Sequence, residues 1–195
     1  PMLYYRELLT TDRDAYGIYV QSPFPKENRR ILIGSDVSSR YTRRNRAEYR
    51  KIAGYIARCV WQRQGNYMVF FPSYRLMEDV LQVYEEEFSV DWVRCVCQTP
   101  DMTEQEREGF LEEFQEREGT LVGFCVLGGI FSEGVDLTGE SLIGAVIVGT
   151  GLPQIGSQRE ILKEYYDKKN HCGFDYAYRY PGMNKVLQAA GRVIR

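Results

Sequence analysis

The residues of this chain best suited to chemistry lie at its carboxyl end, in the segment Gln188-Ala-Ala-Gly-Arg-Val-Ile-Arg195. In a helix, Gln188, Arg192 and Arg195 would share one face, because residues three and four apart are neighbours on a helix surface. Arginine is always charged and presents a rigid fork of donors that matches phosphate oxygens. Gly191 would let a ligand or another backbone come close. The pattern predicts a site for the terminal phosphate of a nucleotide, although two arginines near a helix C-terminus also suit the helix dipole.

Further segments place polar residues directly after apolar runs. Residues 65–74 read Gly-Asn-Tyr-Met-Val-Phe-Phe-Pro-Ser-Tyr, and residues 129–136 read Gly-Ile-Phe-Ser-Glu-Gly-Val-Asp. Residues 22–25 read Ser-Pro-Phe-Pro, and a tyrosine-rich stretch over 174–185 leads into Gln188. Each segment alone carries little weight, but their order along the chain is informative.

In this order, the segments resemble the superfamily 2 DNA helicases of the XPD family, in their DinG-like form. Residues 188–195 resemble motif VI, residues 65–74 motif IV and residues 129–136 motif V, while Ser22-Pro-Phe-Pro25 is similar to the segment after motif III. The resemblance covers nearly the whole chain. It implies an α/β fold of the RecA-like P-loop NTPase type, a three-layer sandwich with a mostly parallel central sheet and helices on both faces. The chain would be the second RecA-like domain, the C-terminal motor domain of an ATP-dependent DNA helicase.

The resemblance also implies roles for residues at an ATP site between two domains. Gln188 would position the attacking water or the γ-phosphate, and Arg192 and Arg195 would stabilise charge on the transferred phosphoryl group. Gly134 and Asp136 would join these three in binding ATP. From the residues alone, Asp136 could equally be a turn aspartate that caps local backbone.

Four residues would contact single-stranded DNA on the same resemblance, namely Ser73, Tyr74, Ser132 and Glu133. Ser73 would bind a phosphate and Tyr74 would stack on a base. A plain helix cap explains Ser73 as well.

The sequence has no Gly-x-x-x-x-Gly-Lys-Ser/Thr phosphate loop and no Asp-Glu-Ala-His-like box for Mg²⁺. In the family these belong to the first RecA-like domain, which would therefore supply most ligands of ATP and Mg²⁺. We expect the isolated chain to be inactive as an ATPase and its partners to be single-stranded DNA and that first domain. The family implies 5′ to 3′ movement, a role in DNA repair or replication and, in some members, an iron–sulfur cluster in the first domain.

Five cysteines, at positions 59, 95, 97, 125 and 172, form no Cys-x-x-Cys pair. We expect no metal site in this chain and treat most of these cysteines as small buried residues of a cytoplasmic protein. Cys95 and Cys97 should face the same side of a strand. No apolar run reaches the ~20 residues of a membrane span, so we expect no membrane partner.

The net charge of −2 hides two segregated runs. Residues 101–118 contain eight acids and two arginines, which is typical of a solvated helix. Residues 40–63 contain one acid, Glu48, and eight basic residues: Arg40, Arg43, Arg44, Arg46, Arg50, Lys51, Arg58 and Arg63. This basic run could be a solvated face or a track for a phosphate backbone.

Hydrophobic periodicity predicts alternating strands and helices, which favour a parallel sheet covered on both faces. The expected strands are Arg29–Gly34, Tyr67–Phe71, Trp92–Gln98, Leu121–Leu127 and Leu142–Val148. The expected helices are Arg43–Gln62, one capped by Ser73, an acidic one capped by Thr103 with Glu106 in a capping box, Gln158–Asp167 and Asn184–Ile194.

The organisation of the chain follows from these elements. We expect residues 1–25 to be a connecting segment from an absent first helicase domain and residues 26–195 to form the RecA-like domain. Two alternatives belong to other functional classes. One is a non-catalytic nucleic-acid-binding module that uses the Arg40–Arg63 face, and the other is a small-nucleotide enzyme, which ranks last because no Gly-x-Gly-x-x-Gly loop follows a strand.

Overall fold

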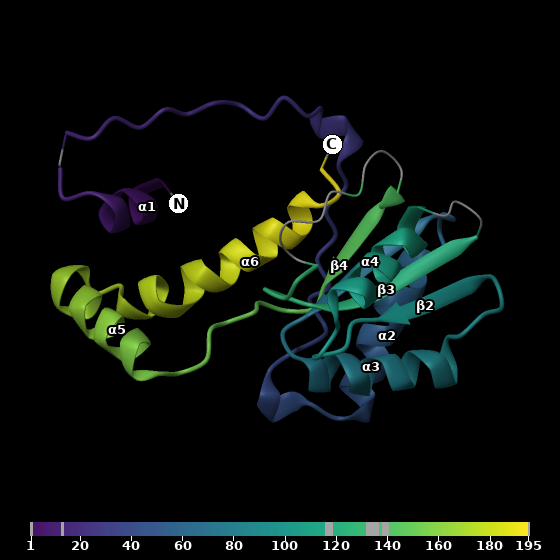
Figure 1. Cartoon of the computed structure of the whole chain (residues 1–195). Helices are drawn as coiled ribbons and strands as arrows, with labels where there is room; N and C mark the ends of the chain where they lie inside the picture. The colour runs from purple at the N-terminus through teal and green to yellow at the C-terminus, as the bar shows by residue number, and fades with distance from the viewer. Residues whose placement is uncertain (1, 13, 116–118, 132–136, 138–140, 195) are drawn as a thin grey trace. The chain divides into compact units, whose positions relative to one another are not determined.

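The computed structural model describes residues 2–12, 14–115, 119–131, 137 and 141–194. Contacts divide the chain into two compact units, one of residues 1–30 with 152–184 and one of residues 31–151 with 185–195. Each unit is described by itself (Figure 1). The predicted boundary after residue 25 stays a prediction.

The larger unit is built on a four-stranded parallel sheet with the strand order β2-β3-β1-β4. The strands are β1 (Asn66–Phe71), β2 (Val93–Cys97), β3 (Thr120–Val126) and β4 (Gly144–Ile147). In register, Tyr67 of β1 pairs with Val122 of β3 on one side and with Gly144 of β4 on the other. Parallel neighbours need crossover connections, and the helices over residues 74–87 and 104–112 separate β1 from β2 and β2 from β3 along the chain.

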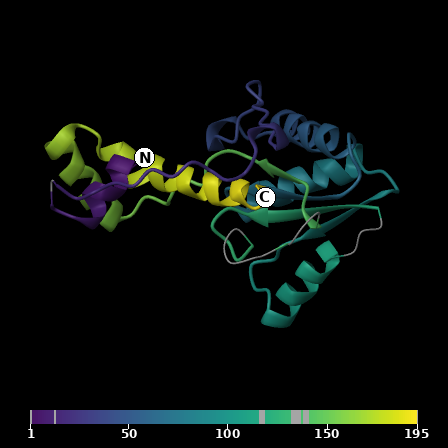
Figure 2. The ribbon, with the colours of Figure 1, turned by 90° about the horizontal axis from the view of Figure 1, so that it is seen from above.

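Alternation along β1 divides the core between the two faces of the sheet. Tyr67, Val69 and Phe71 pack with the apolar stripes of α2 (Arg46–Val60) and α3 (Tyr74–Glu87). Met68 and Phe70 pack with Phe110 and Phe114 from the opposite face, because successive strand residues point to opposite sides. Figure 2 shows the resulting layers, with α2 and α3 on one face and α4 (Glu104–Glu112) on the other. The predicted three-layer α/β sandwich with a parallel sheet is confirmed.

The helix caps predicted from the sequence are present in the structure. Ser73 caps α3, and Thr103 with Glu106 forms the capping box of α4. Asn45 caps α2, so that helix starts three residues later than predicted. One predicted strand is wrong: residues 29–34 form no strand, and Ile31, Leu32 and Ile33 are exposed.

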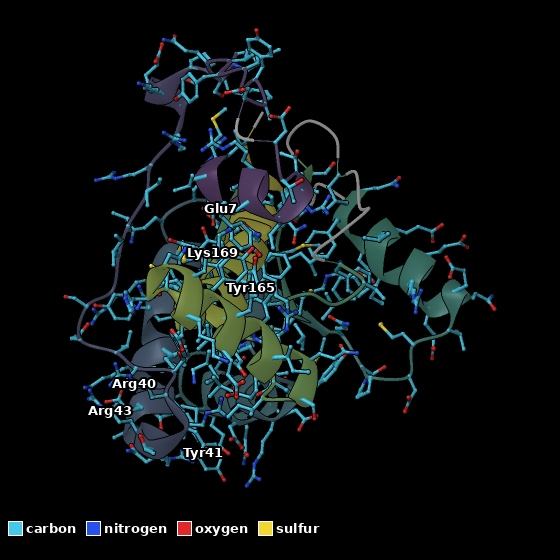
Figure 3. The ribbon with its side chains drawn as sticks, turned by 90° about the vertical axis from the view of Figure 1, so that its left-hand side faces the viewer. Glu7, Arg40, Tyr41, Arg43, Tyr165 and Lys169 are labelled. Atoms are coloured by element: carbon cyan, nitrogen blue, oxygen red, sulfur yellow. The ribbon has the colours of Figure 1, made fainter. Side chains whose placement is uncertain are left out.

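The buried cluster of the smaller unit consists of tyrosine side chains. It contains α1 (Met2–Leu9), the short helix η1 (Lys26–Asn28), α5 (Ser157–Asn170), the π-helix η5 (Asp175–Arg179) and the start of α6 (Tyr180–Gly191). The Tyr166 and Tyr176 rings stack at 3.8 Å, and the Tyr176 hydroxyl donates to Glu7 Oε2 at 2.6 Å. Figure 3 labels Glu7 beside Lys169 of α5, and their charged groups lie 3.8 Å apart. Glu7 thus ties α1 to α5 and η5.

No helix in the described part of the chain is long and apolar enough to cross a membrane.

Candidate nucleotide and nucleic-acid interface

The carboxyl ends of the four strands bring the predicted motifs to one edge of the sheet. Parallel strands all end at the same edge, which is where ligands bind in open α/β sheets. Pro72-Ser73-Tyr74 follows β1, Gln98 follows β2, and Leu127-Gly128-Gly129 follows β3. The end of the 65–74 segment and the start of the 129–136 segment therefore follow neighbouring strands. The strands themselves pack closely, since the rings of Phe71 and Phe124 stack at 5.9 Å.

Ser73 serves the backbone of its own helix. It is extended (φ −161°, ψ 153°), and its Oγ accepts a hydrogen bond from the Leu76 amide at 3.4 Å. This satisfies one of the amides that a helix start leaves without an intrahelical partner. The cap explains why a serine stands here, and a phosphate contact by Ser73 stays a prediction.

Tyr74 is fixed by a buried glutamine that the sequence reasoning missed. Gln98 is 2% exposed, and its Nε2 donates to the Tyr74 hydroxyl at 2.9 Å. Its Oε1 accepts from the Val126 amide at 3.0 Å. One side chain thus joins the motif IV tyrosine to the end of β3, where the motif V segment begins. A glutamine directly after an apolar strand was the signal that could have revealed it.

The side chains of Lys185 and Gln98 both lie close to the turn after β3. Gly128 has a φ of +72°, a conformation that L side chains rarely adopt. A Cβ there would lie 3.1 Å from Nζ of Lys185, and one on Gly129 would lie 3.0 Å from Nε2 of Gln98. The Gly129 amide donates to the Val126 carbonyl at 3.0 Å, so it closes the turn. Lys185 was not predicted to approach this turn, because its position depends on how α6 packs.

The motif VI residues lie at the end of α6. Ala189 is fully buried, and it packs with Leu127, Phe131 and Leu137 in the core cluster beneath α4. Gln188 is exposed and Arg192 is half-buried. The helix ends at Gly191, three residues before the predicted end, and the next amides bond three residues back, as Arg192 to Ala189 at 3.3 Å. A Cβ on Gly191 would meet no described atom of this chain within 4 Å, so nothing within these residues requires a glycine there.

Several predicted site residues lie outside the described part of the chain. They are Ser132, Glu133, Gly134, Asp136 and Arg195. The flanks of the motif V group are described: Phe131 is 1% exposed and Leu137 is 6% exposed. Both belong to the cluster that contains Ala189, so the core joins the two ends of the 132–136 stretch to α6.

Half of the basic run is paired within the domain. Arg46 contacts Glu86 at 2.6 Å and Glu87 at 3.1 Å, and Arg50 also pairs with Glu87. Arg43 and Lys51 each lie 3.3 Å from Glu48. These contacts join α2 to α3 and to the segment before α2. The run is therefore in part a structural framework within the domain, and a role of its residues in binding a phosphate backbone stays a prediction.

The thiols are suited to packing rather than to metal binding. Burial raises the pKa of Cys95 to about 12 and that of Cys97 to about 11, and it also raises the pKa of Cys125 well above its usual value. Cys95 and Cys97 both pack against the cluster that contains α2 and α3, as predicted for one side of a strand. No group of three His, Cys, Asp or Glu side chains suited to a metal ion occurs in the described ranges.

Comparison with known proteins agrees with this geometry. Residues 56–195 match the helicase C-terminal domain family. The chain is 28% identical over 174 residues to the ATP-dependent DNA helicase XPD of Sulfolobus acidocaldarius, covering 84% of this chain. It is also 28% identical over 189 residues to a probable ATP-dependent helicase of Methanocaldococcus jannaschii, covering 91% of this chain. In both cases the match spans 28% of the relative's length.

Solved structures give the same result. A structure described as an XPD helicase superimposes with a TM-score of 0.64 and 25% identity, over 83% of this chain and 28% of the other. An XPD structure described as the apo form has a TM-score of 0.64 at 24% identity, over 82% of this chain and 32% of the other. Since the family match covers more than half of the chain and the fold agrees, this chain belongs to the helicase C-terminal domain family, as an XPD-like superfamily 2 motor domain.

Proposed function

We propose that this domain provides one wall of an interdomain ATP site and part of a single-stranded DNA track in a DinG- or XPD-like helicase. The whole protein would hydrolyse ATP with Mg²⁺, move 5′ to 3′ along DNA and act in DNA repair or replication in the cytoplasm. The first RecA-like domain of the same protein would hold most of the nucleotide and, where present, an iron–sulfur cluster.

One observation carries this proposal. Ala189 and Val193 of the motif VI segment pack into the cluster that contains Leu127, Phe131 and Leu137. This packing supports a shared site at which Gln188 and Arg192 stand beside the motif V segment. Lys185 adds a cation next to the turn at Gly128. Cations with rigid support suit the triphosphate of ATP.

The chemistry assigned to these residues is electrostatic. Arg192 and Arg195 would stabilise the negative charge that grows on the phosphoryl oxygens in the transition state, while Gln188 orients the attacking water. Gly134 and Asp136 would complete the nucleotide side of this wall. Ser73, Tyr74, Ser132 and Glu133 would face the DNA, so that the link from Tyr74 through Gln98 to Val126 would connect the two functions.

The test replaces Arg192 with alanine in the full-length helicase. The phosphate loop of the first domain provides most ground-state binding, so ATP affinity should stay within a few-fold of wild type. The kcat of DNA-stimulated ATP hydrolysis should fall by about 10³ or more, as for other arginines in this role. Arg192→Lys should rescue poorly, because a point charge cannot reproduce the planar fork.

A matched control is Arg94→Ala, which removes an exposed arginine of β2 that pairs with Glu113 at 2.8 Å. It should leave kcat near wild type. If Arg192→Ala keeps more than about a tenth of wild-type kcat, the loss is smaller than this role requires and the assignment is wrong.

A further inference from the structure

A short segment before α2 presents an aromatic ring among arginines. We name residues 40–44, Arg40-Tyr41-Thr42-Arg43-Arg44, the Arg-Tyr segment. Its central part is the 3₁₀ helix η2 (Tyr41–Arg43), and Tyr41 is 75% exposed. Figure 3 labels Arg40, Tyr41 and Arg43 together on this segment. The segment contains three positive charges and no acid.

A buried carboxylate fixes this segment in place. Glu48 is 6% exposed and accepts from the Ser38 amide at 2.9 Å and from Arg43 at 3.3 Å. Lys51 contacts the same carboxylate at 3.3 Å and the Asp36 carbonyl at 3.2 Å. The backbone is thus held on both sides of Tyr41, so a ligand of this ring would pay little of the usual entropic cost of ordering a loop.

An arginine lies over the exposed ring. The Arg44 guanidinium carbon is 5.5 Å from the centroid of Tyr41, which is cation–π range, and Arg44 Nε donates to the Ser39 carbonyl at 3.4 Å. The guanidinium covers one side of the ring, while Tyr41 as a whole remains 75% exposed. An unpaired base, which has a free π-face, can stack on such a ring.

Arg44 of this segment and Arg75 of α3 both act electrostatically on one tyrosine, Tyr49. Burial raises the pKa of Tyr49 on α2, together with a hydrogen bond to Asp79, whereas the charges of Arg44 and Arg75 both oppose that rise. Arg44 and Arg75 therefore lie near the same hydroxyl. Arg75 follows Ser73 and Tyr74 directly in the sequence, so it places a positive charge next to the residues assigned to DNA contact.

We propose that the Arg-Tyr segment is a further binding site for single-stranded DNA, in which a base stacks on Tyr41 while Arg40 and Arg44 hold the adjacent phosphates. The site lies outside motifs IV, V and VI, and the proposal rests on the proposed helicase function. A duplex does not fit, because its bases are stacked on one another and leave no face for Tyr41. Arg43 is not assigned to DNA binding, because its ion pair with Glu48 fixes the segment in place.

The test measures binding of a fluorescein-labelled oligo-dT to the 195-residue chain by anisotropy at low salt. Tyr41→Ala should weaken binding about 5-fold or more, the effect expected of one lost base stack. Tyr41→Phe should bind as wild type, since the ring is kept. Arg40→Ala should weaken binding and lower the slope of log K against log salt by about 1, as one phosphate contact is lost.

Two controls separate stacking from general damage. Tyr165→Ala removes another exposed tyrosine, 57% exposed on α5, and should bind as wild type. The second control is an abasic oligonucleotide of equal length, which has no base to stack. Its affinity for the wild-type chain should be no higher than the affinity of oligo-dT for Tyr41→Ala. The chain has tryptophans only at positions 61 and 92, so Tyr41→Trp adds a probe whose fluorescence should be quenched by oligo-dT.

The proposal is overturned if the wild-type chain does not bind oligo-dT, if Tyr41→Ala binds like wild type, or if Tyr41→Phe loses as much as Tyr41→Ala. Equal losses in Tyr41→Ala and Tyr165→Ala would overturn it as well. None of these measurements involves ATP turnover. The ATPase test with Arg192→Ala can therefore contradict the proposed function while the binding test supports the Arg-Tyr segment as a DNA site. The opposite pair of results is equally possible.

Discussion

Gln98 shows how one side chain can join two motifs. It is almost fully buried, and both ends of its amide are used, by the Tyr74 hydroxyl and the Val126 amide. Burial is the largest cause that raises the pKa of Tyr74, and the hydrogen bond from Gln98 opposes that rise. A movement of the Tyr74 side chain would be transmitted directly to the end of β3.

Replacing Gln98 with leucine should destabilise the chain by about 1–3 kcal/mol, because the Val126 amide loses its partner in a buried setting. Gln98→Glu should cost less, since a carboxylate still accepts from that amide and from the Tyr74 hydroxyl. Urea unfolding of the purified chain measures both. Tyr74→Phe combined with Gln98→Leu should be less than additive, because both changes remove the same hydrogen bond. A loss below about 0.5 kcal/mol for Gln98→Leu, the level of an ordinary surface substitution, would contradict this account.

At the level of elements, the start of α3 carries two assigned tasks. Ser73 caps the helix through the Leu76 amide at 3.4 Å, and it is also the residue assigned to a DNA phosphate. The two tasks differ in their response to negative charge. A carboxylate at the N-cap accepts the same amide and suits the helix dipole, whereas it repels a phosphate.

Ser73→Ala should lower stability by about 1 kcal/mol, and Ser73→Asp should keep nearly wild-type stability. The order of the two variants should reverse for DNA binding: Ser73→Asp should have a lower affinity for single-stranded DNA than Ser73→Ala. Thermal unfolding and oligo-dT anisotropy on the same samples provide the comparison. Thr103→Ala, which removes the cap of α4, is the control that should lose stability without losing DNA affinity. If Ser73→Asp binds DNA as well as wild type, Ser73 is only a cap.

The ion pairs between α2 and α3 predict how stability responds to acid. Hydrogen bonds from Arg46 and Gln82 lower the pKa of Glu86, and the hydrogen bond from Arg50 is the largest cause that lowers the pKa of Glu87. A carboxylate with a lowered folded pKa contributes stability above its unfolded pKa of about 4.3. This contribution is lost as the pH falls through the folded pKa. The melting temperature of wild type should therefore fall more between pH 7 and pH 3 than that of a variant with Glu86→Gln and Glu87→Gln. Identical pH profiles would show that these exposed pairs contribute nothing, as many surface pairs do.

At the scale of the whole molecule, this chain spans 28% of the length of its helicase relatives. Its sequence holds no phosphate loop and no acidic box for Mg²⁺. The proposed wall of Gln188, Arg192 and Arg195 would act on charge that develops during the reaction, so we expect it not to hold the nucleotide for turnover by itself.

The purified 195-residue chain should therefore show no DNA-stimulated release of phosphate from ATP. A coupled phosphate assay with and without oligo-dT tests this, and Arg192→Ala serves to identify contaminating activity, which that substitution would leave unchanged. Phosphate release by wild type that disappears in Arg192→Ala would show that the domain is catalytic alone.

The amino-acid sequence by itself determined the features that depend on near neighbours. The unbroken apolar run Tyr67–Phe71 predicted a buried strand, and the caps at Ser73 and Thr103 followed from single residues. Caps and periodicity act within a few positions, so they can be read before the chain folds. The order of the motif-like segments also identified the family, which the comparisons confirmed.

Only the tertiary structure decided the features that depend on contacts between residues far apart in the sequence. Ile31, Leu32 and Ile33 form an apolar run, yet no strand forms there, because a strand needs a neighbour that completes its hydrogen bonds and a local pattern does not report one. Gln98 meets Val126, and Lys185 meets the turn at Gly128, only because crossover connections bring these segments to one edge of the sheet. The ion pairs that occupy half of the basic run likewise depend on the packing of α2 against α3. Charge and composition show which residues could make such contacts, and packing selects the ones that do.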